Sequence, residues 1–337
     1  MDAFLELTAD QRAIRCEKVG DELGMPPGAV EKDFWVCWVL RALYRLNVGP
    51  HLAFKGGTSL SKCYGMIDRF SEDIDLVIER AFLGFDGDNA PENAPSGKER
   101  ARRIDRLKAA CREYIATTLF PELRAIVQQQ SGEANVKSLT IDPDDPDQQT
   151  ILFPYEPVLK GPAYVRPVVK IELGARSDTE PNESRFVEPY LAQVPNHGLG
   201  DCRVQVKVVA AERTFWEKVS LLHEESFREG PPRSRLARHY YDLWCLDRQG
   251  IADRAIQMGS LFEDVAEHRR IYFKLGGVAQ AQLRRGSVTL LPTEAKLPMW
   301  ESDYRAMLDT MFIGQPPTFT AIMTALRSLE SRINLSA

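Results

Sequence analysis

The chain has 337 residues, of which 44% are hydrophobic and 27% charged, and its formal net charge is −5. This is the composition of an ordinary globular protein with one large domain or two smaller ones. A negative net charge argues against a protein that coats nucleic acid non-specifically, although it is compatible with a local basic patch. No apolar run approaches the roughly 18 residues needed to cross a bilayer, and the N-terminus lacks a signal-like core. We therefore expect a cytoplasmic protein with no membrane partner.

The six cysteines form no C-x-x-C pair, and the five histidines are scattered along the chain. Cys37 and Cys245 fall in apolar helical patterns, which is typical of buried thiols. We expect free cysteines and no zinc site built from histidine and cysteine.

Two helices are predicted at the start of the chain. Residues 8–23 begin at Thr8, a good N-cap, and stop at Gly24. A Pro-Pro-Gly turn separates this helix from a second, residues 29–46, whose many aromatic and aliphatic side chains favour deep burial. We interpret the second helix as part of the core. Two of its polar residues remain as weaker site candidates: Lys32 and Asp33.

The most informative stretch follows, and it opens with two glycines. Gly56 and Gly57 come after a short apolar run and precede a segment that can form a helix. Glycine permits a positive φ and a close backbone approach, so a turn here can direct N–H groups at phosphate oxygens. The hydroxyl groups of Thr58 and Ser59 come next. We interpret these four residues as a cradle for the triphosphate of a nucleotide.

A strand with two acids follows the glycine turn. Ile74, Leu76 and Ile78 alternate with Asp73 and Asp75, and a period of two places both carboxylates on one face. Two neighbouring carboxylates repel unless a cation neutralises them, and Mg²⁺ takes hard oxygen ligands that it shares with substrate phosphates. Each feature alone is most often a plain turn or a solvated strand. Together they predict metal-dependent phosphoryl or nucleotidyl transfer.

These residues resemble the bacterial AbiEii/AbiGii nucleotidyltransferase toxins, a branch of the DNA polymerase β-like nucleotidyltransferase superfamily. The superfamily pattern is a Gly-Gly or Gly-Ser turn, a short helix, and a strand with two spaced acids. The gap between Gly57 and Asp73 is longer than the commonest spacing, and it holds Arg-Phe-Ser-Glu, which is similar to the family's own R-x-S-x-D-[IL]-D variant. Three residues of this region join the candidate substrate-binding set: Lys62, Arg69 and Ser71.

A loop and a basic helix are predicted next. Residues 84–97 are rich in turn-forming residues and indicate a surface loop, and residues 99–119 indicate a helix that carries several arginines. Such a run is most often a solvated helix face, but it is also the first candidate for an RNA-binding surface. The basic residues of the helix are Arg102, Arg103, Arg106 and Lys108. Two further basic clusters lie at 228–238 and 269–274.

A mixed sheet is expected from the strand patterns that follow. The predicted strands are 150–155, 164–174, 185–194 and 203–209. In the second of these, alternation places Lys170 and Glu172 on one face. Polymerase β-like sites commonly take a third carboxylate from a neighbouring strand, so the resemblance implies Glu172 in that role, with Lys170 as a substrate contact. The plain alternative is an exposed Glu172 paired with Lys170.

The last third of the chain is predicted to be helical. Ala211–His223 resembles the family's A-E-x-x-x-x-K motif, and the resemblance implies that Lys218 offsets charge on the departing pyrophosphate. Leu236–Trp244 resembles the R-x-x-x-D-[LI] motif, which implies an active-site role for Asp242 and adds Arg238 as a substrate-binding candidate. The alternatives are an ordinary snorkelling lysine at 218 and a structural Arg238–Asp242 pair one helical turn apart.

The expected fold is therefore α/β (α+β): a polymerase β-like nucleotidyltransferase core with a mixed sheet in residues 1–209, and a helical domain in residues 210–337. The resemblance implies the toxin of a toxin–antitoxin or phage-defence pair, with an antitoxin as partner. It would use NTP and Mg²⁺, or Mn²⁺ in its place, to modify RNA, with the tRNA 3′ end as the favoured acceptor. Asp73, Asp75 and Glu172 would hold the metal, and we expect a monomer.

Three alternatives remain open at this stage. The same chemistry could modify a protein side chain or a small molecule. The same phosphate and metal groups could support transfer of the γ-phosphate, as in a kinase. The third alternative is an inactive domain that only binds a partner. The presence of both acids, together with the family's motifs at 56–75, 170–173, 211–223 and 236–244, argues against it.

Overall fold

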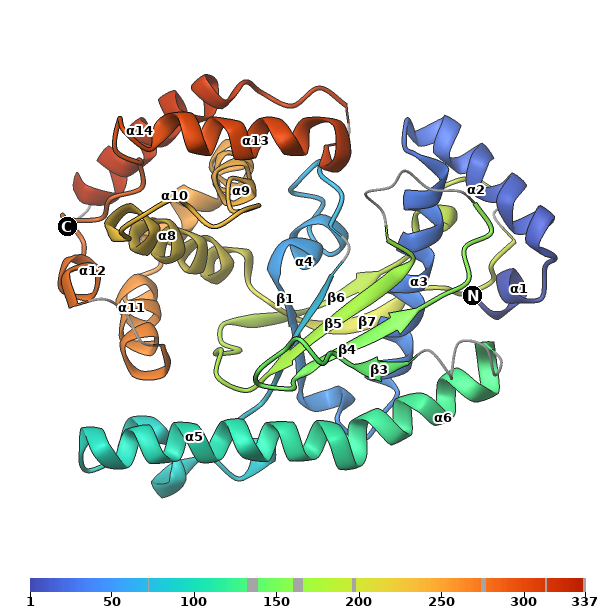
Figure 1. Ribbon diagram of the computed structural model, residues 1–337, viewed down its shortest axis with the longest axis horizontal. Coiled ribbons are helices and arrows are strands. Elements are labelled where there is room, and N and C mark those ends of the chain that lie inside the picture. The colour runs from blue at the N-terminus through green and yellow to red at the C-terminus, as the bar shows by residue number, and fades with distance from the viewer. Residues whose placement is uncertain are drawn as a thin grey trace. The chain divides into compact units, whose positions relative to one another are not determined.

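The computed structural model describes residues 1–71, 73–131, 139–159, 166–195, 198–273, 277–312 and 314–335 (Figure 1). The chain divides into two compact units. The first comprises Met1–Cys63 and Phe70–Val208, and the second comprises Tyr64–Arg69 and Val209–Ala337. The second unit thus includes a short segment from the region between the glycine turn and the acidic strand.

The first unit is built on a seven-stranded sheet with the order β3-β4-β5-β2-β1-β7-β6. β1 runs antiparallel to β2, whereas β2 is parallel to β5 and β1 is parallel to β7, which confirms the predicted mixed sheet. The strands are β1 (Leu52–Lys55), β2 (Ile74–Ile78), β3 (Thr140–Ile141), β4 (Thr150–Pro154), β5 (Val168–Gly174), β6 (Asn182–Val187) and β7 (Val204–Val209).

One strand differs from its predicted bounds. The expected strand at 185–194 begins earlier, at Asn182, and ends at Val187, after which Tyr190–Ala192 form a 3₁₀ turn. Pro189 lies between them and has no N–H to donate to a sheet ladder, which accounts for the early end. Residues 164 and 165, the predicted start of another strand, lie outside the described residues.

The helices of the first unit are α1 (Asp2–Leu5), α2 (Ala9–Leu23), α3 (Pro27–Tyr44), α4 (Gly56–Lys62), α5 (Gly97–Tyr114) and α6 (Phe120–Ser131). α2 begins at a Thr8 capping box and ends at a left-handed Gly24, as predicted. α3 is buried along its length. Trp38 stacks on Phe153 of β4 with ring centroids 5.7 Å apart, and Trp35 meets the same ring at a tilt over 5.6 Å. The prediction of a core helix is thus confirmed.

The predicted basic helix extends well beyond its expected end. α5 continues through one π-helical turn, Ile115–Leu119, into α6, and Figure 1 shows the two as one long rod. In the loop before it, Gly87–Asn89 and Pro91–Asn93 form short 3₁₀ turns.

The second unit is helical in its described part, as predicted. Its helices are α8 (Ala211–Phe227), α9 (Arg238–Arg248), α10 (Ile251–Gln257), α11 (Leu261–Tyr272), α12 (Gly277–Gln282), α13 (Leu297–Met311) and α14 (Phe319–Leu335). Aromatic side chains fill its core: Trp216 donates to the Ala255 carbonyl, and the Tyr240 ring meets Trp300 edge-on. Within the described ranges, each helix of the chain is too short or too polar to span a bilayer.

Candidate active site

The glycine turn is in close contact with the acidic strand. Gly56 is the first residue of α4, directly after β1, and its φ of +81° lies in the region that favours glycine. A Cβ atom at this position would lie 2.1 Å from Asp75 Oδ2. Only glycine therefore allows the Asp75 carboxylate to approach the turn this closely.

Asp75 lies in a lateral row of polar residues across three strands. Its register partners are Lys55 on β1 and Glu172 on β5, and paired residues of neighbouring strands share one face of a sheet. Asp75 is half-buried, whereas Ile74 and Leu76 on either side of it are buried. Asp73 stands one residue ahead of β2 and continues the same alternation, so the predicted pair of acids lies at the start of the strand.

Glu172 already has a cationic partner. Lys170 Nζ lies 2.6 Å from Glu172 Oε1, and the two side chains are 38% and 42% exposed. The structure therefore contains the pair that was the plain alternative for Glu172. Its role as third carboxylate remains a prediction.

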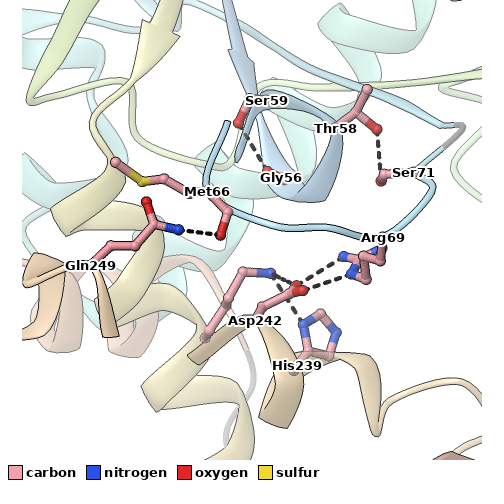
Figure 2. A network of polar contacts seen from close by, with 10 residues as sticks. Gly56, Thr58, Ser59, Met66, Arg69, Ser71, His239, Asp242 and Gln249 are labelled. Carbon is pink, nitrogen blue, oxygen red and sulfur yellow. Dashed lines mark hydrogen bonds and ion pairs between the residues drawn. The ribbon is translucent and has the colours of Figure 1, made fainter. Parts of the chain in front are cut away.

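The hydroxyl groups of the turn are buried and hydrogen-bonded within the first unit. The Thr58 side chain lies 2.9 Å from Ser71 Oγ and 2.5 Å from the Asp73 carbonyl oxygen. Ser59 Oγ donates to the Gly56 carbonyl over 2.9 Å. Figure 2 shows Thr58 turned toward Ser71 and Ser59 turned back to Gly56. Both hydroxyl groups thus hold the turn, and their contact with the triphosphate stays a prediction.

Lys62, at the last residue of α4, is also buried. Its Nζ lies 2.7 Å from Asp33 Oδ1 on α3, with both side chains 4% exposed, and 3.8 Å from the centre of the Tyr190 ring. Burial alone would lower the pKa of Lys62, but Asp33 raises that pKa well above its ordinary value. This environment favours a structural role for Lys62 over the predicted contact with substrate.

The residues near Gly56 fit a magnesium ion that is completed by its substrate. No group of three or more His, Cys, Asp or Glu side chains in the described ranges is gathered closely enough to hold a metal. Mg²⁺, however, is usually bound through one or two carboxylates together with substrate phosphates and water. Asp75 places one carboxylate against the glycine turn, and Asp73 continues the same alternation one residue ahead of β2, which fits this donor set.

The second unit contains a buried charge cluster around Asp242 on α9, which is fully buried. Arg69 donates to it from Nε over 2.6 Å and from Nη2 over 2.9 Å, and Lys218 Nζ on α8 donates over 2.7 Å. Figure 2 shows the Arg69 guanidinium facing the Asp242 carboxylate. The partners of Asp242 are thus Arg69 and Lys218, while Arg238, the partner suggested by the sequence, is half-buried at the start of α9.

This environment shifts the pKa values of the cluster. Burial alone would raise the pKa of Asp242, but Arg69 and Lys218 hold that pKa far below its ordinary value. Burial lowers the pKa of Lys218 against the attraction of Asp242. The surface-lysine alternative for Lys218 is therefore wrong, since its side chain is 7% exposed.

His239 is a member of this cluster that sequence reasoning missed. Its Nδ1 lies 3.4 Å from Lys218 Nζ, and burial together with Lys218 lowers the pKa of the imidazole well below its ordinary value. The ring is therefore neutral at pH 7. Its position three residues before Asp242, one turn away on α9, is the local signal that could have indicated it.

A glycine turn against a strand of spaced acids on a mixed sheet is the arrangement of a nucleotidyltransferase. Residues 38–327 match the family model described as "Nucleotidyl transferase AbiEii toxin, Type IV TA system". The chain belongs to this family and is a nucleotidyltransferase toxin of a type IV toxin–antitoxin system. Membership implies an NTP substrate and an antitoxin partner.

Among solved structures, the chain is similar to "MenT4, nucleotidyltransferase toxin Rv2826c from Mycobacterium tuberculosis H37Rv". The two share 20% sequence identity, with a TM-score of 0.43 over 98% of this chain and 94% of that chain. No curated protein sequence matches the chain.

Proposed function

We propose that this enzyme transfers a nucleoside monophosphate from NTP to RNA, with the 3′ end of tRNA as acceptor, and that Asp73 and Asp75 hold the required Mg²⁺. The observation that carries the proposal is the approach of Asp75 to Gly56. It brings an anionic metal ligand next to a turn that can accept phosphate, and nucleotidyl transfer needs both groups at one place.

The residues of the first unit then have distinct roles. Backbone N–H groups of Gly56 and Gly57 bind phosphate oxygens of the triphosphate. Asp73 and Asp75 would hold the ion beside that triphosphate, and Glu172, the register partner of Asp75, would supply a third carboxylate. When bound, Mg²⁺ supplies neutralisation of the charge that develops on the transferring phosphate. The acceptor hydroxyl attacks the α-phosphate, and pyrophosphate leaves.

In the second unit, the catalytic roles proposed for Lys218 and Asp242 rest on the family's motifs. All described acceptor contacts of the Asp242 oxygens are with Arg69 and Lys218. Because these hydrogen bonds engage both carboxylate oxygens, we assign Asp242 the role of holding Lys218 in position. Lys218 is then the cation that offsets charge on the pyrophosphate.

Labelled substrates test the reaction type. Purified enzyme is incubated with total bacterial tRNA, Mg²⁺ and NTP labelled at either the α- or the γ-phosphate. Nucleotidyl transfer leaves only the α-label on the acceptor, whereas a kinase leaves only the γ-label. The Asp75→Asn protein provides the background in each assay. Label from the α-phosphate on protein, with RNA unlabelled, would overturn the RNA acceptor while retaining the chemistry.

A further inference from the structure

The side chain of Thr58 contacts both parts of the proposed metal and phosphate site. Thr58 is 1% exposed, and its hydroxyl lies within hydrogen-bond distance of Ser71 Oγ and of the Asp73 carbonyl oxygen. It belongs to α4, the helix that begins at Gly56, whereas Asp73 leads into β2. One hydroxyl group therefore joins the glycine turn to the acidic segment.

Proton counting decides what this hydroxyl can do. A hydroxyl group carries a single proton, and a backbone carbonyl can only accept. The Thr58 hydroxyl donates toward both Ser71 Oγ and the Asp73 carbonyl oxygen, so its one proton is already shared between two acceptors. A phosphate oxygen of NTP is also an acceptor, so Thr58 has no second proton to offer it.

We propose that Thr58 is a positioning residue that holds Asp73 at the correct place for the metal, and that it is not a ligand of the triphosphate. This inference rests on the proposed metal role of Asp73 and Asp75. The register pairs of β2 begin at Ile74, so Asp73 stands just ahead of the sheet ladder. The Thr58 bond fixes the backbone at that point, and hence the direction of the Asp73 carboxylate.

Binding of Mn²⁺, measured through the paramagnetic resonance of the free ion in the presence of a non-hydrolysable NTP analogue, tests the proposal without requiring turnover. Thr58→Val removes the hydroxyl at nearly constant volume, and Thr58→Ser retains it. Loss of a group that orients a metal ligand typically costs about 10- to 100-fold in metal affinity. We expect Thr58→Val to weaken Mn²⁺ binding by about tenfold or more, and Thr58→Ser to bind as the wild type does.

Nucleotide binding in the presence of EDTA separates the two roles of Thr58. A positioning residue leaves metal-free NTP binding unchanged in Thr58→Val. If that variant loses metal-free NTP binding and keeps its Mn²⁺ affinity, Thr58 is a phosphate ligand and the proposal fails. It also fails if a folded Thr58→Val protein keeps both affinities. Should Thr58→Val not fold, Thr58→Cys, whose thiol is a weak donor, is measured against the same outcomes.

Asp73→Asn distinguishes failure of the positioning role from failure of the proposed function. The proposed metal role requires that Asp73→Asn weakens Mn²⁺ binding. If it does and Thr58→Val does not, only the positioning role is overturned. If Asp73→Asn binds Mn²⁺ as the wild type does, the metal site itself is wrongly placed.

Discussion

At the scale of single residues, the two acids carry the proposed chemistry. We expect Asp73→Asn or Asp75→Asn to abolish nucleotide transfer and growth inhibition, because each removes an anionic metal ligand. The loss should reach on the order of 10³-fold in rate. Circular dichroism checks that each variant is folded, and Ser184→Ala on the exposed part of β6 serves as a control. A folded Asp73→Asn protein with near-normal toxicity contradicts the assignment.

Lys218 combines a structural contact with a proposed catalytic role. In Lys218→Met, Asp242 keeps its two bonds to Arg69, so we expect a moderate loss of stability, about 1–3 kcal/mol. We also expect a lower transfer rate from protein that is fully folded, because the variant lacks the Lys218 cation that is proposed to offset charge on the pyrophosphate. Urea unfolding and NTP transfer, both measured below the melting transition, compare the two effects. Full activity in the folded variant would leave Lys218 with a structural role alone.

His239 makes the stability of the protein depend on pH. Its folded pKa lies below that of the unfolded chain, so the unfolded state binds the proton first. The contribution to stability is therefore complete above about pH 6.5 and is lost as the pH falls toward the folded pKa. Between the unfolded and the folded pKa of this one group, the free energy of unfolding falls by at most about 1.4 kcal/mol per pH unit.

Urea unfolding at pH 7.5, 6.5 and 5.5 measures this effect in wild type and in His239→Gln. The variant should lose less stability on acidification than the wild type. His268, which stacks on Tyr272 elsewhere in the second unit, provides the matched His268→Gln control. Equal slopes for wild type and His239→Gln would assign the acid sensitivity to other groups.

At the scale of elements, α4 is fixed at both ends. Gly56 begins it against Asp75, and Lys62 ends it against Asp33. Lys62→Met would leave Asp33 buried without its cation, which typically costs about 3–5 kcal/mol. Urea unfolding measures the loss, and Lys18→Met, at a lysine 68% exposed on α2, should change stability by less than about 0.5 kcal/mol. A loss of similar size in both variants would argue against the buried pair.

The same elements show what local patterns can predict. Alternation of apolar and polar residues predicted β2 and the face of β5 that carries Glu172. Capping residues predicted where α2 begins and ends. The contact of Asp242 with Arg69 could not be found this way, because Arg69 lies 173 residues earlier in the chain. The sequence also does not reveal which acceptor a hydroxyl group will meet: Thr58 bonds the Asp73 carbonyl oxygen and Ser59 bonds the Gly56 carbonyl oxygen. Long-range hydrogen bonds depend on the completed fold.

At the scale of the whole molecule, many arginines of the three predicted basic clusters already form ion pairs with nearby acids. Arg102 and Arg103 both pair with Glu99, and Arg228 and Arg233 both pair with Glu225. Arg269 and Arg270 also pair with acids, while Lys274 lies outside the described residues. RNA binding by these clusters therefore requires their ion pairs to be exchanged for phosphate, which is easiest where the side chain is exposed.

Arg102 offers the sharpest test of such a surface, because its side chain is 68% exposed. If α5 contacts RNA, Arg102→Glu should weaken tRNA modification and lower the salt dependence of RNA binding by about 0.7–0.9 in log–log slope per lost contact. NTP binding should not change. Lys18→Glu on α2, equally exposed and also paired with a nearby glutamate, is the matched control. If both charge reversals change RNA binding equally, α5 is only a solvent-exposed helix face and does not contact RNA.

The contact between Gly56 and Asp75 also has a genetic consequence. Any replacement of Gly56 places a carbon atom 2.1 Å from a carboxylate oxygen of Asp75, in a backbone conformation that residues with a side chain rarely adopt. Selection of host cells that survive expression of a saturation library should therefore recover every amino acid except glycine at position 56. Gly97 provides the contrast within the same chain, because an added Cβ there meets nothing within 4 Å. Codon 97 should be free to drift, while codon 56 is restricted to synonymous change for as long as the toxin remains active.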